Sequence, residues 1–162
     1  MSFRIGIGYD VHAFATGRQL ILGGVPIPFS KGLAGHSDAD VLTHALCDAL
    51  LGATALGDLG NLFPDTDEQY KNISSLELLK KVIKKIRTSL YEIENMDAVI
   101  IAEQPEMKPF IPEMRRVLAE AMSVSASQIS IKATTTEHLG FTGREEGIAV
   151  TVIVLLKIAE KT

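Results

Sequence analysis

The sequence predicts an α+β fold: a single domain over residues 1–162, with one mixed four-stranded sheet, helices covering one face of that sheet, and a small β-hairpin beside it. Two observations predict this class. The chain has 162 residues, 46% of them hydrophobic, with no low-complexity run, which is typical of one globular domain. Short strand-like runs and amphipathic helical segments also follow one another without a repeat or a linker.

The N-terminal part predicts a strand followed by a hairpin. Residues 3–8 are a strand-like run whose two glycines, Gly6 and Gly8, partly match a nucleotide-binding fingerprint. The third glycine and the following helix of that fingerprint are missing, so we set this interpretation aside. Residues 19–29 form two apolar arms around Gly23-Gly24, a turn typical of hairpins, and prolines place the second arm at a sheet edge or outside the ladder.

The first helix is expected over residues 37–56, after a glycine-rich loop. Ser37 and the acidic residues that follow it are typical of a helix N-terminus. The single cysteine, Cys47, lies inside this helix, where we expect a buried, inert thiol rather than a nucleophile. At 3.6 residues per turn, one broad apolar face is expected to pack on the core. Its members are Val41, Leu42, Ala45, Leu46, Ala49, Leu50 and Ala53.

The remainder of the chain predicts two further helices and three strands. After an irregular loop over 57–67, the pattern Ser74-x-x-Glu77 predicts a capping box that opens a helix to about Tyr91. The lysines on the back of this helix are interpreted as a solvated face rather than a binding patch. The other expected elements are a buried strand at 96–102, a turn at 104–109, a helix at 112–122, and strands at 129–135 and 147–158 joined by a loop at 136–146.

Composition excludes several classes of protein. The formal net charge of −4 and the absence of a basic stripe argue against nucleic acid as a partner. A lone cysteine excludes an intrachain disulfide and fits a reducing compartment. The N-terminus shows no signal-peptide pattern, and the longest apolar run, residues 148–156, is too short to span a bilayer. We therefore expect a cytoplasmic protein with no membrane partner.

Three of the four histidines fall in two runs, residues 8–12 and 36–44. Asp10 and His12, two apart in a strand, project to the same face, and His44 points away from the apolar face of the predicted helix. Two histidines and a carboxylate would form a three-ligand zinc site with a free fourth position, as in catalytic zinc sites. The alternative, that these are ordinary surface or core residues, stays open because Asp-x-His is common.

A second chemical signal is the run of Thr134, Thr135 and Thr136 followed by Glu137. Its hydroxyls offer donors to anionic oxygens, and the carboxylate could hold a divalent cation that bridges a diphosphate. The alternative is that β-branched threonines merely end a strand. An acidic chain without a glycine-rich phosphate loop must offset a polyanionic substrate with metal ions or helix N-termini. Zinc at the first site and Mg²⁺ or Mn²⁺ at Glu137 would serve.

The order of these motifs resembles the 2-C-methyl-D-erythritol 2,4-cyclodiphosphate synthase family of the non-mevalonate isoprenoid pathway. The resemblance covers nearly the whole chain, from about Arg4 to Ile158. It rests on GYDVH at 8–12, HSDADVLTHA at 36–45, GDLG at 57–60, FPDTD at 63–67, KATTTE at 132–137 and LGFTGR at 139–144.

The resemblance implies a homotrimer with active sites between neighbouring chains, a small-molecule substrate, zinc, and Mg²⁺ or Mn²⁺ as a second ion. Asp10, His12 and His44 match the zinc ligands, and Glu137 matches the carboxylate associated with the second ion. The implied catalytic residues are Asp10, His12, His36, His44, Thr135 and Glu137. The implied substrate-binding residues are His36 and Ser37 for phosphates, Asp58, Gly60, Phe63 and Asp65 for methylerythritol, and Ala102, Pro105, Met107, Ala133, Thr134 and Thr135 for cytidine diphosphate.

Two further features follow from the resemblance. Phe141 and Arg144, with Tyr9, match the lining of an apolar cavity on the trimer axis, which in some members holds an isoprenoid diphosphate. Glu106 stands in the matched cytidine turn where relatives often carry lysine.

The implied reaction is a cyclisation. In 4-diphosphocytidyl-2-C-methyl-D-erythritol 2-phosphate, the 2-phosphate attacks the β-phosphorus, and CMP leaves. Two other functions stay open on the residues alone. A zinc-dependent phosphohydrolase would use water as the nucleophile, and a non-catalytic trimeric binding protein would use zinc only to stiffen its fold. The threonine run beside a candidate cytidine turn favours the cyclase.

Overall fold

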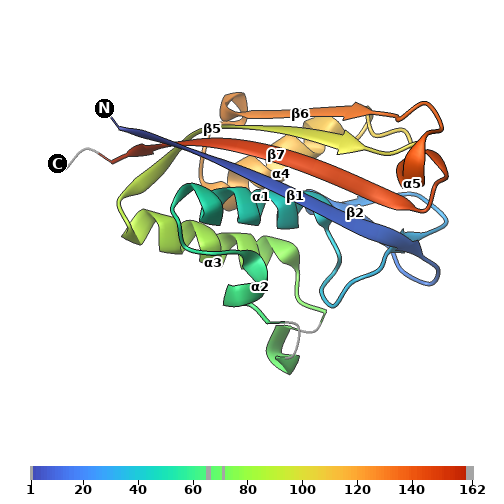
Figure 1. Cartoon of the computed structure of the whole chain (residues 1–162), viewed down its shortest axis with the longest axis horizontal. Coiled ribbons are helices and arrows are strands. Elements are labelled where there is room, and N and C mark those ends of the chain that lie inside the picture. Colours follow the sequence, from blue (N-terminus) through green and yellow to red (C-terminus); the bar gives the residue numbers. More distant parts are fainter. Residues whose placement is uncertain (1, 65–66, 71, 160–162) are drawn as a thin grey trace.

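The computed structural model describes residues 2–64, 67–70 and 72–159 and confirms an α+β fold with a curved mixed sheet (Figure 1). The sheet has five strands in the order β4-β1-β7-β5-β6, rather than the four expected. The added strand is β4 (Gly32–Leu33), which pairs with the end of β1 (Phe3–Ala15). Two residues are too few to show the alternation that marks a strand in a sequence.

The main strands run along most of the molecule. β1 pairs antiparallel with β7 (Gly147–Ile158), which pairs antiparallel with β5 (Tyr91–Ile101). β5 pairs in parallel with β6 (Ile129–Thr134), so the sheet is mixed, as predicted. The predicted hairpin forms separately, from β2 (Leu20–Leu22) and β3 (Val25–Ile27) on either side of the two glycines.

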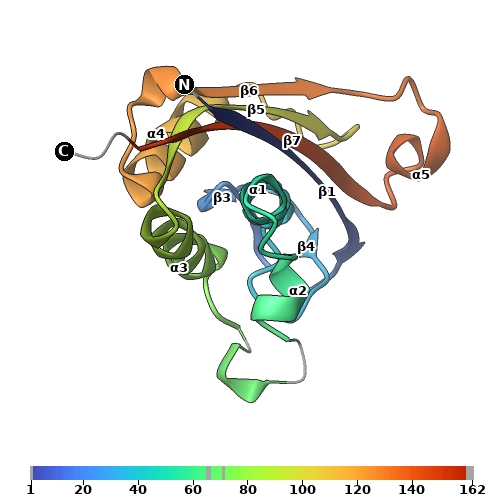
Figure 2. The ribbon, with the colours of Figure 1, turned by 60° about the vertical axis from the view of Figure 1, so that its left-hand side comes forward.

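The long helices all lie on one face of the sheet (Figure 2). α1 (Val41–Ala53) packs beneath β1 and β7, α3 (Ser75–Thr88) lies beside it, and α4 (Ile111–Met122) packs against α3 and the adjoining part of the sheet. Short turns of helix complete the described chain: α2 (Leu59–Leu62), η1 (Glu68–Tyr70), η2 (Ala126–Gln128) and α5 (Gly140–Gly143). Within the described residues, no helix combines the length and apolarity that crossing a membrane requires.

The first predicted helix was wrong at both ends: it was expected over residues 37–56 and is observed at Val41–Ala53. Its start is set by a contact with the hairpin. Asp40, not Ser37, is the N-cap: its buried carboxylate accepts the N–H of Thr43 at 3.0 Å. The same carboxylate accepts the N–H groups of Gly23 and Gly24 at 2.9 and 2.7 Å. α1 is buried on almost every side, including Cys47, and burial raises the pKa of that thiol, as expected of an inert cysteine.

The predicted capping box of the second helix does not form. Ser74 is the N-cap of α3 but makes no side-chain capping bond, and Glu77 instead pairs with Lys80 at 2.7 Å. Asp38, far away in sequence, accepts the N–H of Ser75 at 3.0 Å and so satisfies the start of this helix. The helix also ends at Thr88 rather than Tyr91, because a turn leads directly into β5, which is longer than the predicted strand at 96–102.

The two glycines of β1 let α1 lie directly on the sheet. A Cβ at Gly6 would lie 2.0 Å from the carbonyl oxygen of Ala49, and one at Gly8 would lie 1.9 Å from that of Ala45. Contacts this short are sterically forbidden, so any side chain at either position would push the helix away. The glycine pair is therefore a packing feature, and it brings α1 close to the strand end that carries Asp10.

Replacing Gly8 with alanine should destabilise the fold. Because the clash is with helix backbone, we expect Gly8→Ala to lower the free energy of unfolding by about 1–3 kcal/mol or more, as overpacking typically does. Urea denaturation measures this. Gly52→Ala is a matched control, since the nearest atom to a Cβ there, outside its own helix, is the carbonyl oxygen of Ile7, at an ordinary contact distance of 3.9 Å. It should leave stability unchanged or raise it by about 0.5–1 kcal/mol. Equal stability of Gly8→Ala and wild type would contradict the close contact.

The sheet face opposite the helices is exposed and apolar. Along β1, the residues that alternate with the two glycines point away from α1, and the most exposed of them, Ile5, is 71% accessible. We call this set the apolar sheet face. Its members are Phe3, Ile5, Ile7, Tyr9 and Val11 of β1 and Ile153 of β7. A contiguous apolar patch of this kind marks an interaction surface in a water-soluble domain.

Candidate metal and phosphate site

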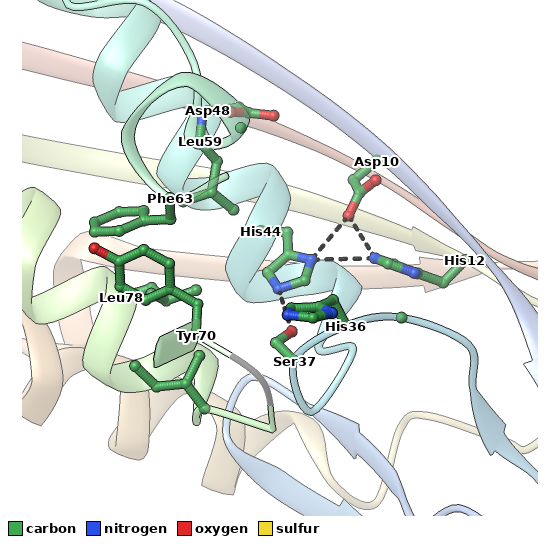
Figure 3. A pocket seen from close by; sticks show the side chains of 13 residues that line it. Asp10, His12, His36, Ser37, His44, Asp48, Leu59, Phe63, Tyr70 and Leu78 are labelled. Carbon is green, nitrogen blue, oxygen red and sulfur yellow. Dashed lines mark hydrogen bonds and ion pairs between the residues drawn. The ribbon is translucent and has the colours of Figure 1, made fainter. Parts of the chain in front are cut away.

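Asp10, His12 and His44 converge on one point, as predicted (Figure 3). Asp10 Oδ2 lies 3.0 Å from His12 Nε2 and 3.3 Å from His44 Nδ1, and the two ring nitrogens are 3.1 Å apart. β1 supplies the first two residues on the face toward α1, and the helix supplies the third. The close packing of Gly8 on Ala45 places His44, the residue before Ala45, within reach of the strand.

Hydrogen bonds on the outer side of each ring fix which nitrogen faces the centre. His12 Nδ1 lies 2.5 Å from the carbonyl oxygen of Ala34, so it donates there and leaves Nε2 unprotonated. His44 Nε2 lies 2.8 Å from Ser75 Oγ, whose own hydrogen is donated to Asp38. His44 Nδ1 is therefore the free nitrogen. Such outer partners are what orient histidine ligands in metal sites.

The charge distribution at this point suits a cation. Burial would raise the pKa of Asp10, but ion pairs with His12 and His44 outweigh it and hold that pKa far below its usual range. Burial lowers the pKa of His12, and the neighbouring Asp10 carboxylate, as a hydrogen-bond acceptor and a negative charge, more than reverses this effect. Two ring nitrogens and a carboxylate oxygen that face one another repel unless a positive charge lies between them. The donor set thus fits a divalent metal with nitrogen and oxygen ligands.

The triad opens into a cavity of about 270 Å³. His36 lies in its wall, and His36 Nε2 is buried without a hydrogen-bond partner among the described residues. An unpaired buried polar atom is costly, so this nitrogen is available to bind a polar group that enters the cavity. This volume is at the lower end of ligand sites, so the cavity can hold only part of a nucleotide-sized substrate. Its lining also includes Gly35, Ser37, Asp48, Leu59, Gly60, Phe63, Tyr70, Ile73 and Leu78.

The expected methylerythritol residues lie at the cavity's far wall. Gly60 and Phe63 line it, and the Phe63 ring packs edge-on against Tyr70 with centroids 5.2 Å apart. Asp58 instead caps α2, accepting the N–H of Asn61 at 2.8 Å. Asp65 lies outside the described residues.

Three contributors to this site were missed from the sequence. Asp48 lines the cavity, accepts the N–H of Leu59 at 2.8 Å, and has its pKa raised, first by burial. Its position one turn after His44 was a readable signal. Arg18 donates to the carbonyls of Gly35 and Ser37, at 2.7 Å for Gly35, and so fixes the loop around His36. Arg18 and Ser75 had no local signal, because their partners are distant in sequence.

The remaining predicted residues form a second group at the β6 edge of the sheet. Ala102, Pro105 and Met107 follow β5, and the N–H of Ala102 donates to Thr134 O at 3.0 Å. Thr135 Oγ1 donates to the Glu137 carboxylate at 2.8 Å. Glu137 belongs to no cluster of three metal-ligating side chains in the described ranges. Arg144 pairs with Glu146 at 2.8 Å, and Phe141 is half-buried in α5.

Within one chain the two groups are kept apart by the sheet. Asp10 is paired with Val150, Val150 with Ile100, and Ile100 with Ala133, so these four residues form one row across β1, β7, β5 and β6. Three strand spacings separate the ends of this row by about 14 Å. The buried side chains of Val150 and Ile100 lie between them. The triad and the Ala133 group therefore do not meet in one chain.

Comparison with known proteins gives a consistent result along the chain. Residues 3–157 match the YgbB family. The chain is 60% identical over 153 residues to the 2-C-methyl-D-erythritol 2,4-cyclodiphosphate synthase of Desulfitobacterium hafniense, covering 94% of this chain and 97% of that protein. It is 56% identical over 158 residues to the synthase of Geobacillus thermodenitrificans, with 98% and 99% covered.

Solved structures are also similar. The bifunctional IspDF from Campylobacter jejuni matches with a TM-score of 0.95 and 46% identity, over 98% of this chain and 43% of that one. The IspF of Plasmodium falciparum, in complex with CDP, matches with a TM-score of 0.87 and 31% identity, over 98% of each chain.

Proposed function

The chain belongs to the YgbB family, and on this premise we propose that it forms 2-C-methyl-D-erythritol 2,4-cyclodiphosphate at a site shared by two neighbouring chains. The observation that carries the proposal is the convergence of Asp10, His12 and His44 on a cavity with an unpaired, buried His36 nitrogen. We propose the whole chain, 1–162, as one synthase domain acting in the cytoplasm.

The reaction is an intramolecular phosphoryl transfer. An oxygen of the 2-phosphate of 4-diphosphocytidyl-2-C-methyl-D-erythritol 2-phosphate forms a bond to the β-phosphorus, and the bond from that phosphorus to the CMP oxygen breaks. A phosphate dianion is already a nucleophile, so no side chain has to remove a proton. The protein's main task is to hold two anionic groups of one flexible molecule together. Orientation of this kind can supply about 7–11 kcal/mol of the barrier.

The triad fits zinc best, because two imidazoles and one carboxylate are typical ligands of catalytic zinc with an open position. Zinc bound there would hold the 2-phosphate and partly neutralise its charge. His36 Nε2 is the chain's own group for a phosphate oxygen, since it has no partner in the described residues. Arg18 and Asn72 fix the backbone around it: Arg18 binds the carbonyls on both sides, and Asn72 N–H donates to His36 O at 2.9 Å.

The second group is the proposed cytidine diphosphate site. Ala102, Pro105, Met107 and Ala133 surround the expected cytidine, and hydroxyls of the threonine run lie at its diphosphate rim. Glu137 is the proposed ligand of Mg²⁺ or Mn²⁺, which would stabilise charge on the diphosphate and on the leaving CMP. The CDP complex of the Plasmodium falciparum relative supports a cytidine nucleotide as the ligand.

A homotrimer would unite the two groups. In one chain, two strands separate the triad from Ala133, and the cavity is too small for the whole substrate. The apolar sheet face gives each chain a surface that is stabilised by contact with further copies. Tyr9 lies on that face, and with Phe141 and Arg144 it is the proposed lining of an axial cavity for an isoprenoid diphosphate.

Phosphorus NMR tests the activity. The purified protein is incubated with the proposed substrate, zinc and Mg²⁺, and the spectrum is followed. A cyclic diphosphate and CMP in equal amounts are expected. Inorganic phosphate or a linear product would indicate a phosphohydrolase, and an unchanged spectrum despite CDP binding would indicate a non-catalytic binding protein. Either of these two results would overturn the proposal.

His44→Ala should remove the zinc and leave the fold. The variant loses one of three metal ligands, while alanine is a good helix former at this position in α1. Metal analysis of purified protein should find one zinc per chain in wild type and almost none in the variant. His138→Ala is the control, since that side chain is 85% exposed and outside the cavity. Unchanged zinc in His44→Ala would remove His44 from the ligand set.

A further inference from the structure

Glu103, which has no role in the site described so far, is buried between the two loops of the second group. It follows Ala102 directly after β5, and its side chain is only 7% exposed. One carboxylate oxygen, Oε1, accepts the N–H of Thr136 at 3.0 Å and the N–H of His138 at 3.1 Å. The same oxygen lies 3.4 Å from Thr136 Oγ1.

The two amides that Glu103 binds enclose Glu137, and the turn there is unfavourable for the backbone. Glu137 and His138 have φ angles of +51° and +64°, so two consecutive residues with side chains adopt the left-handed conformation. In this turn the amides on either side of Glu137, those of Thr136 and His138, point toward one acceptor, Glu103 Oε1. Without that acceptor, a chain of L-residues favours other conformations. The orientation of the Glu137 carboxylate therefore depends on the bonds made by its neighbours.

The far side of the turn is held by α5. Thr136 Oγ1 donates to Leu139 O at 2.6 Å and lies 3.0 Å from Thr142 Oγ1. At Gly143 a Cβ would lie 2.2 Å from the carbonyl carbon of His138, so the helix packs directly on the turn. Glu103 is the matching support from the side of β5.

We propose that Glu103 is a positioning residue that holds the Thr136–His138 turn and so directs the Glu137 carboxylate to the second divalent ion. The inference rests on the proposed role of Glu137. It also connects two parts of the site. The segment after β5, which carries Pro105 and Met107, and the turn that carries the ion's ligand are joined by one buried carboxylate. Nucleotide binding at the first part and ion binding at the second are then held in a fixed relative position.

The geometry depends on the length of the Glu103 side chain rather than on its charge. All three hydrogen-bonding contacts, from the amides of Thr136 and His138 and from Thr136 Oγ1, go to Oε1. The other oxygen, Oε2, has a longer contact of 3.6 Å with Nδ1 of the exposed His138 ring. The amides of His138 and Thr136 hold the pKa of Glu103 below its usual value, in agreement with an acceptor for backbone N–H groups. A glutamine keeps an oxygen at the same distance from the backbone, whereas an aspartate keeps the charge but is one methylene shorter.

The test compares Glu103→Gln with Glu103→Asp. Hydrogen exchange of the Thr136 and His138 amides is measured without substrate or divalent ion, and the Mn²⁺ concentration for half-maximal turnover is measured separately. Glu103→Asp should exchange these amides about tenfold faster or more and require about tenfold more Mn²⁺, because the two N–H groups lose their shared acceptor. Glu103→Gln should match wild type in both measurements. Glu92→Ala, an exposed carboxylate at the other end of β5, should also match wild type.

The outcomes separate this inference from the proposed function. Protected amides in Glu103→Asp, or fast exchange in Glu103→Gln with its zinc retained, would overturn the positioning role. If Glu137→Gln leaves the Mn²⁺ requirement unchanged, the second-ion assignment fails, and the exchange rates still decide whether Glu103 holds the turn. A uniform rise in exchange over the whole sheet in both variants would indicate general destabilisation and also overturn the inference.

Discussion

Glu137→Gln should reduce turnover by roughly 100-fold or more, the loss typical of removing one group that stabilises transition-state charge. The substitution keeps the shape of the side chain and one oxygen, but it removes the negative charge that a hard divalent cation prefers. Zinc should stay bound, because its three proposed ligands, Asp10, His12 and His44, are unchanged. Raised Mg²⁺ or Mn²⁺ should restore part of the turnover. CMP release and bound zinc are measured over a metal titration.

Glu145→Gln is the matched control for this experiment. Glu145 lies in the same connection between β6 and β7, is exposed, and is outside the proposed site. Its replacement removes the same charge, so it accounts for any general electrostatic effect on a polyanionic substrate. It should leave turnover and the metal requirement unchanged. Wild-type turnover of Glu137→Gln without added divalent ion would refute the role of the second ion.

Ile7→Glu should convert the assembly into folded, inactive monomers. Ile7 is 67% exposed at the centre of the apolar sheet face, so the carboxylate is solvated in a single chain. In an interface it would be buried without a partner, at a cost of several kcal/mol for each copy. Turnover should fall at least about 100-fold, because even a misplacement of about 1 Å between reacting groups costs that much. Light scattering gives the mass, and circular dichroism reports the fold.

Leu90→Glu controls for the loss of an exposed apolar side chain. Leu90 is 51% exposed in the turn between α3 and β5, outside the apolar sheet face. That variant should keep the mass and turnover of wild type. Zinc should remain bound in both variants, since the triad lies on the helix side of β1. A monomer of Ile7→Glu with full turnover would exclude a shared active site.

The convergence of Asp10, His12 and His44 was predictable because the position of each follows a local periodicity. Asp10 and His12 share a face because side chains alternate along a strand, and His44 is separated from the apolar face of α1 by the helical repeat. The strand at residues 147–158 and the hairpin were also predicted with their boundaries nearly as observed, since the first is a long apolar run and the second has a Gly-Gly turn.

The parts that were mispredicted depend on contacts between distant residues. Asp40 begins α1 because the hairpin's amides reach it, and Asp38 caps α3 across a separation of 37 residues. The Ser74–Glu77 pattern had the right residues for a capping box, but Glu77 pairs with Lys80. For Gly6 and Gly8 a nucleotide-binding motif was rightly set aside, but their packing role was not predicted, because only the packed helix explains why a Cβ cannot fit there.

The position of the second group relative to the triad is also a property of the sheet and not of local sequence. Strand order and register place Ala133 in the same row as Asp10 but at the opposite side of two buried strands. Those pairings join residues that lie between about 30 and 140 positions apart in the sequence, so no local pattern encodes them. Glu103 was missed for the same reason, since its partners lie 33 and 35 residues away.

A mixed-subunit experiment most directly tests the central claim that each active site combines the triad of one chain with Glu137 of a neighbour. His44→Ala and Glu137→Gln are co-expressed with different affinity tags, and mixed assemblies are purified through both tags. If the groups come from different chains, every mixed trimer has both groups intact in one of its three sites, and turnover should recover to about a third of wild type. If both groups of each site come from one chain, no site is intact, and the mixed assemblies would be as inactive as either variant alone.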